Sequence, residues 1–77
     1  MGRINNLKPA KCEKLLEKCG WEFVNRKGTH ATFYKVINDK DSFVQVIWNN
    51  KTIYWKNAKV MIDKTDIPEE IWIKKCK

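Results

Sequence analysis

The stretch from Trp21 to Ile37, WEFVNRKGTHATFYKVI, decides the fold, because it predicts two strands joined by a tight turn. Apolar and polar side chains alternate over Trp21 to Arg26 and again over Thr29 to Ile37. This period of two is typical of half-buried strands. Lys27-Gly28 lies between the two runs and suits a short hairpin turn that needs glycine at positive φ. The sequence therefore predicts an antiparallel pair.

The second of these strands divides its side chains between two faces, because neighbouring side chains on a strand point in opposite directions. Ala31, Phe33 and Ile37 share one face, on which we expect Phe33 to anchor the core. The opposite face carries His30, Thr32, Tyr34 and Val36. A polar turn at Asn38 to Asp41 and a further strand from Ser42 to Trp48 complete a three-stranded meander.

Helical patterns flank the predicted sheet. From Pro9 to Cys19, apolar residues recur at helical spacing, with proline suited to the first turn and Gly20 to the C-terminal stop. After a turn at Asn49-Asn50, Thr52 to Trp55 is either a fourth short strand or the start of a helix, and we favour the helix.

Two cap residues place the helices after the sheet. Asn57 is the expected cap of the helix that carries Ala58, Met61 and Ile62. Asp66, followed by Pro68 and Glu69, is the expected cap of a last short helix. The order α-β-β-β-α gives an α+β fold, in which helices pack on one face of a three-stranded antiparallel sheet and the other face stays open.

Size and charge limit the organisation and the partners. The 77 residues predict a single domain, residues 1–77, with a small core. Sixteen Lys and Arg against nine Asp and Glu give a net charge of +7, which favours nucleic acid as partner. No stretch approaches the roughly 18 apolar residues of a membrane span, and Met1 to Asn6 lacks the apolar core of a signal peptide. We expect a cytoplasmic protein with no membrane partner.

The three cysteines fit the same compartment. Cys12 and Cys19 lie seven residues apart in a helical pattern, about 10 Å along the axis, so they are expected in the core and unbonded to each other. Cys76 is expected in a terminal tail. No Cys-x-x-Cys pair is present, and we expect neither a metal nor a cofactor.

Residues 14–33, KLLEKCGWEFVNRKGTHATF, resemble the HicA family of toxin ribonucleases. In that family a helix ending in Gly-aromatic leads through a strand to a Gly-Ser-His motif. Here Gly28 matches the glycine, Thr29 stands in place of the serine, and His30 matches the catalytic histidine. The segment Ile53 to Trp72 is similar to the family's closing pattern. The resemblance implies a double-stranded-RNA-binding-domain-like fold, metal-independent cleavage of messenger RNA, and a HicB-type antitoxin as partner.

The chemistry of the residues supports a nuclease hypothesis beside this resemblance. His30 is the only histidine, and imidazole has an unperturbed pKa of about 6.5, near neutral pH. It would take the 2′-OH proton of RNA as general base, while Lys27 and Arg26 hold the phosphate. Thr29 or Tyr34 would orient the ribose or the leaving group. The alternative is that His30 is an ordinary polar residue at a strand edge.

Two other functional classes stay open. One is a catalytically inactive RNA-binding module, which would bind RNA in a salt-dependent way without cleaving it. The other is an inhibitor or adaptor that binds a protein through its basic face or its tryptophans. Most of the four tryptophans are expected in the core, but Trp48 or Trp55, on either side of the Asn49-Asn50 turn, would stack on an unpaired base or anchor a partner.

Overall fold

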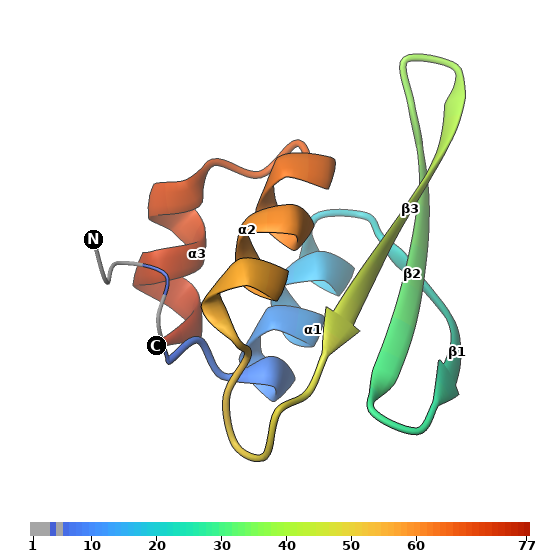
Figure 1. The fold of residues 1–77 in the computed structure, drawn as a ribbon. Coiled ribbons are helices and arrows are strands. Elements are labelled where there is room, and N and C mark those ends of the chain that lie inside the picture. The colour runs from blue at the N-terminus through green and yellow to red at the C-terminus, as the bar shows by residue number, and fades with distance from the viewer. Residues whose placement is uncertain (1–3, 5) are drawn as a thin grey trace.

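The computed structural model describes Ile4 and residues 6–77 and places three strands between one helix and two others. The strands form one antiparallel sheet in the order β1-β2-β3, and the helices lie on one side of it (Figure 1). The predicted α+β class and three-stranded sheet with one open face are confirmed, with two helices following the sheet. The elements are α1 (Pro9–Lys18), β1 (Glu22–Lys27), β2 (His30–Ile37), β3 (Lys40–Ile47), α2 (Trp55–Lys64) and α3 (Glu69–Cys76).

Helix α1 forms as its pattern predicts. Pro9 occupies the first turn, where a missing N–H costs nothing, and Cys12, Leu15 and Leu16 are buried. The helix ends at Lys18, one residue before the expected end, and Gly20 with φ +93° turns the chain toward the sheet. This positive φ brings the next N–H onto the carbonyl of Leu16 at 2.9 Å.

Both hairpins close with two-residue loops. Lys27 pairs with His30, so the first loop is Gly28-Thr29, one residue later than the predicted Lys27-Gly28. In the second hairpin Ile37 pairs with Lys40 across Asn38 and Asp39, whose φ angles are +53° and +63°. Two positive φ angles are typical of a type I′ turn, whose twist matches that of the strands. Strand β3 therefore begins at Lys40 instead of the predicted Ser42, and it ends at Ile47.

Strand β1 forms one edge of the sheet and carries a bulge. Phe23 pairs with Phe33 and Asn25 with Thr32, so the register shifts by one residue between them. All six residues of the strand are exposed. The ring of Phe23 nevertheless packs edge-on against Phe33, with 5.6 Å between centroids. The bulge places Arg26 on the helix side of the sheet, because it pairs with the buried Ala31.

The core lies between the sheet and the helices. Phe33 is buried there, as expected, together with Val44 and Val46 of β3. Cross-strand partners share a face, so these side chains form one layer. Among the described residues, no polar or charged residue is buried. The core consists of Ile4, Leu7, Cys12, Leu15, Leu16, Trp21, Ala31, Phe33, Val44, Val46, Ile53, Ala58, Met61, Ile62, Ile67, Trp72 and Cys76.

The segment between β3 and α2 differs from the expectation. Thr52 forms an isolated bridge with Asn49, and Ile53 forms another with Leu7. Helix α2 then begins at Trp55, so both readings of this stretch hold in part. The predicted cap Asn57 lies inside the first turn of the helix, because the bridge of Ile53 fixes an earlier start.

The last helix also starts differently. Pro68 holds the cap position with no side-chain cap bond, and Asp66 instead accepts a hydrogen bond from the Lys35 ammonium at 2.9 Å. Lys35 donates a second bond to the Cys19 carbonyl at 2.8 Å, so it joins β2 to two loops on the helix side. The expected cap was wrong because a long-range cation takes the carboxylate.

The C-terminal cysteine is part of the core. Cys76 is the last residue of α3, where a terminal tail was expected, and both it and Cys12 are fully buried. A hydrogen bond to Cys76 and burial raise the pKa of the Cys12 thiol. The backbone N–H of Lys8 donates to the Cys76 carbonyl at 2.7 Å. Helices α1 and α3 are therefore joined at the corner where the described chain begins and ends.

Candidate functional site

The β1–β2 turn brings Lys27, Gly28, Thr29 and His30 together at one end of the sheet. Gly28 adopts φ +57°, a conformation that side chains with a Cβ rarely take. No atom lies within 4 Å of a Cβ built on Gly28. Backbone conformation alone therefore explains the glycine. The four residues are all exposed, so the turn presents its side chains to solvent.

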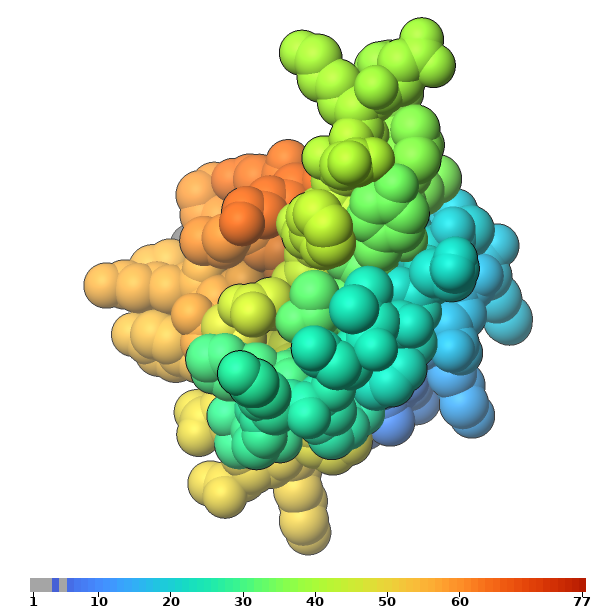
Figure 2. Space-filling model, turned by 90° about the vertical axis from the view of Figure 1, so that its right-hand side faces the viewer, coloured from blue at the N-terminus to red at the C-terminus, as the bar shows by residue number. Residues whose placement is uncertain are grey.

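His30 lies on the open face of the sheet. Its neighbour Ala31 is fully buried, and alternation along β2 turns His30 the other way. The strand partners of His30 are Lys27 and Ile47. Directly opposed side chains in an antiparallel pair have Cβ atoms about 5 Å apart, so the Lys27 ammonium can reach a phosphate beside the imidazole. Figure 2 looks onto this face.

Within the described part of the chain, no side-chain hydrogen bond reaches His30 or Lys27. The imidazole is therefore open to contact with a bound group. Among Ile4 and residues 6–77, no side chain fixes the orientation of the imidazole as the acid of a catalytic triad does.

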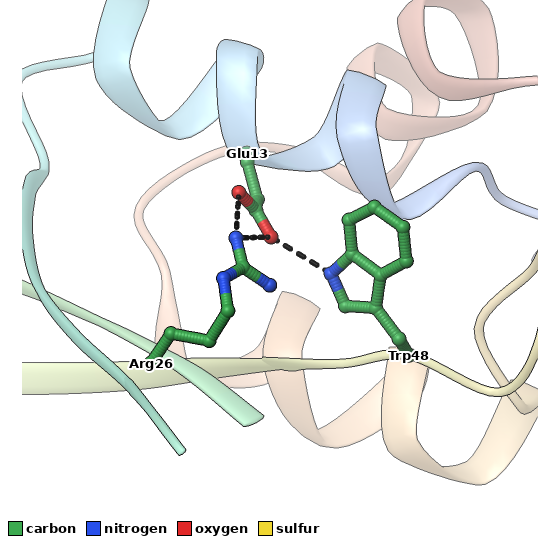
Figure 3. A network of polar contacts seen from close by, with 3 residues as sticks. All are labelled: Glu13, Arg26 and Trp48. Carbon is green, nitrogen blue, oxygen red and sulfur yellow. Dashed lines mark hydrogen bonds and ion pairs between the residues drawn. The ribbon is translucent and has the colours of Figure 1, made fainter. Parts of the chain in front are cut away.

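Arg26 is separated from this group. It lies on the helix side, where its guanidinium donates to both carboxylate oxygens of Glu13 at 2.9 and 3.1 Å. Its guanidinium carbon lies 5.5 Å from the centroid of the Trp48 ring. Figure 3 shows the three side chains meeting from α1, β1 and the end of β3. Arg26 thus has a structural ion pair and shares no face with His30.

Glu13 and Trp48 complete this network. The indole N–H of Trp48 donates to Glu13 at 2.8 Å, so the carboxylate accepts three bonds. The backbone N–H of Trp48 donates to the Thr29 carbonyl at 2.9 Å, which anchors the turn that carries His30. In the sequence, Glu13 lies among the lysines of a helical segment, a pattern typical of an ordinary solvated face. No local sequence pattern indicates that Glu13, Arg26 and Trp48 meet, because they come from three separate elements.

Tyr34 lies away from the turn. It shares the open face with His30 but is four residues along the strand, about 13 Å at the rise of a β-strand. Its hydroxyl donates to Asp41 at 2.7 Å, and this bond raises the pKa of Tyr34. Its ring packs on Phe43, with 5.1 Å between centroids. Of the two residues predicted to orient the ribose or the leaving group, Thr29 and Tyr34, only Thr29 lies in the same turn as His30.

The four tryptophans differ in how far they are exposed to solvent. Trp21 and Trp72 are buried in the core, and Trp48 is half-buried in the Glu13 network. Trp55 is 43% exposed, beside the exposed Tyr54. Of the two tryptophans that flank the Asn49-Asn50 turn, Trp55 is thus the one available to a ligand.

Across Ile4 and residues 6–77, no three His, Cys, Asp or Glu side chains gather in a group able to hold a metal ion. None of the helices in this part of the chain has the length and apolarity needed to cross a membrane.

Comparisons with protein-family models, with curated proteins and with solved structures found no match to this chain.

Proposed function

We propose that this protein is a metal-independent endoribonuclease of the HicA toxin type, with His30 as general base. The observation that carries the proposal is the exposed imidazole on the open sheet face, opposite Lys27 and next to a glycine turn. The net charge of +7 supports RNA as substrate. The double-stranded-RNA-binding-domain-like relationship and a HicB-type antitoxin as partner belong to the same proposal, and both rest on the motif resemblance.

The chemistry uses the nucleophile that RNA itself carries. The His30 imidazole takes the proton of a 2′-OH, and the oxygen attacks the adjacent phosphorus. The bond from phosphorus to O5′ breaks, and O5′ takes up a proton from the imidazolium or from water. The products are a 2′,3′-cyclic phosphate and a 5′-OH end. Lys27 stabilises the negative charge that develops on the phosphoryl oxygens.

The remaining predicted site residues have different parts in this proposal. Gly28 permits the turn, and Thr29, which precedes His30 in the same turn, would contact the ribose through its hydroxyl. Arg26 is paired with Glu13 on the helix side, so in this proposal it supports the hairpin that carries His30. Tyr34, about 13 Å along the strand, would contact a neighbouring nucleotide.

The first test is induced expression in a bacterial host, with growth and messenger-RNA decay compared between the natural chain and His30→Ala at equal protein levels. Losing a general base slows cleavage by about 10² to 10⁴-fold. We expect growth arrest and RNA decay that the variant abolishes. Val36→Ala is the matched control, because Val36 is exposed on the same strand and face.

A second test uses purified protein and a short RNA in a buffer that contains a chelator. The proposal predicts cleavage, 2′,3′-cyclic phosphate ends, and loss of cleavage in His30→Ala with unchanged thermal unfolding. Absence of cleavage by the natural chain, both in cells and in solution, would overturn the proposal.

The second candidate is an RNA-binding module without catalysis. The favouring observation is that, among the described residues, no side chain hydrogen-bonds to His30 to orient it. This candidate predicts salt-dependent RNA affinity, no cleavage, and equal affinity for the natural chain and His30→Ala.

A further inference from the structure

Two neighbouring aromatic side chains, Tyr54 and Trp55, are exposed where the chain passes from β3 to α2. Their exposed fractions are 44% and 43%, and their ring centroids lie 6.0 Å apart. The core takes up Trp21 and Trp72 completely, so the fold has the means to bury large rings. Leaving two such rings together in water forgoes a large hydrophobic gain and marks a contact surface.

The surface around the two rings is preformed. Tyr54 and Trp55 line a shallow hollow together with Asn49 and Thr52. Asn49 and Thr52 exchange backbone hydrogen bonds of 2.8 and 3.2 Å, which hold the turn between them. Trp55 begins helix α2, whose inner face is anchored in the core. A ligand therefore meets rings whose backbone is already fixed.

The charge around the rings suits a phosphate backbone. Three lysines, Lys51, Lys56 and Lys59, lie close to the rings in the sequence, and Lys59 pairs with Asp63 at 4.0 Å. One of these, Lys56, places its ammonium 5.5 Å from the centroid of the Trp55 ring. An aromatic surface with a cation beside it is a combination that binds single-stranded nucleic acid, because bases stack on the rings and a phosphate meets the ammonium.

The aromatic pair lies at the same end of the molecule as the His30 turn. The backbone N–H of Trp48, which ends the β3 segment, donates to the carbonyl of Thr29 at 2.9 Å. Figure 1 shows the β1–β2 turn and the loop from β3 to α2 at the lower end of the fold. In Figure 2 the yellow segment after β3 lies directly below the β1–β2 turn.

We propose that Tyr54 and Trp55 form a stacking surface for unpaired RNA bases beside the His30 turn. The inference rests on the proposed function, because the stacked strand is the one that His30 would cleave. Duplex RNA is a poor ligand for this surface, because its bases are already stacked inside the helix. The substrate class is therefore single-stranded RNA, held by its bases as well as by its phosphates.

The experiment measures affinity in a His30→Ala background, so that cleavage does not interfere. Three probes of about ten nucleotides are compared, within the span that single-strand sites cover. They are a single-stranded RNA, its blunt duplex, and a ribose-phosphate strand without bases. The second substitution is Trp55→Ala, and the matched control is Val60→Ala, an exposed apolar residue on the same helix.

We expect Trp55→Ala to weaken binding of the single-stranded RNA by about 5- to 150-fold, the loss of one stacked base. Its affinity for the strand without bases should not change, and Val60→Ala should leave all three affinities unchanged. Indole fluorescence should fall on addition of the single strand and not in Trp55→Ala, because Trp55 is the most exposed of the four tryptophans.

Equal affinity of Trp55→Ala and its parent for the single strand would overturn the stacking surface. Cleavage by the natural chain would in that case still support the nuclease. Conversely, base-dependent binding through Trp55 without any cleavage would support the stacking surface and contradict the nuclease.

Discussion

Removing the carboxylate of Glu13 tests how the His30 turn is held on the fold. Glu13 accepts two hydrogen bonds from Arg26 and one from Trp48, and Trp48 in turn contacts the turn through Thr29. The Arg26 side chain is 41% exposed, so water screens the ion pair, which contributes at most about 1 kcal/mol. The indole bond to a half-buried carboxylate adds about 1 kcal/mol.

Glu13→Ala should therefore lower the free energy of unfolding by about 2 kcal/mol. In a domain of this size the melting temperature falls by about 8 to 16 °C. Glu13→Gln is the control, because its amide oxygen still accepts the indole bond, and it should lose about half as much. Thermal unfolding of both variants measures the total loss of stability. A double-mutant cycle against Trp48→Phe separates the contribution of the indole bond from that of the ion pair.

Salt separates the ion pair from the indole bond. At 1 M salt the Debye length is about 3 Å, so the ion pair is screened. The free energy of unfolding lost in Glu13→Gln should then shrink, whereas the share that Glu13→Ala loses through the indole bond should remain. A loss below about 0.5 kcal/mol in Glu13→Ala would refute the reasoning, since that is the range of an unconnected surface substitution.

Three further predictions concern single features of the fold. Gly28→Ala should cost about 1 to 2 kcal/mol in urea unfolding, from its φ of +57° alone, while Gly28→Asn should cost less. The Lys35 ammonium lowers the pKa of the Asp66 carboxyl, so this pair stabilises the fold above about pH 4 and is lost as pH falls through the lowered pKa. Asp66→Asn should flatten the acid side of the stability curve, and an unaltered curve would contradict the pairing. The Cys12 thiol, buried with a raised pKa against Cys76, should react with a thiol reagent only at the rate of unfolding; fast labelling of the native protein would disprove its burial.

The parts of the fold that local patterns encode were predictable. Alternation identified the strands, and the spacing of Cys12, Leu15 and Leu16 identified α1, because burial on one face imposes those periods. The strand ends were less certain. Asn38 and Asp39 both take positive φ, and composition does not distinguish such a two-residue loop from a longer polar turn.

Contacts between distant residues were outside what the sequence reveals. Asp66 has the surroundings of a helix cap, but its partner Lys35 comes from 31 residues away. Glu13 has the surroundings of a solvated helix face, but Trp48 lies 35 residues away. The turn that carries His30 was predictable because its residues are consecutive in the sequence. The position of Arg26 on the opposite face depends on the bulge in β1, which no sequence pattern indicates.

The bulged edge of β1 has a consequence for how copies of the chain meet. An edge strand offers unpaired N–H and C=O groups, and here it also exposes Phe23 and Val24, at 47% and 49%. A straight strand of that composition would invite another chain to pair with it and extend the sheet. The register shift between Phe23 and Asn25 breaks the regular spacing of those groups, and Lys27 adds repulsion between like edges. Deleting Val24 would restore a regular edge, and with it a tendency to aggregate.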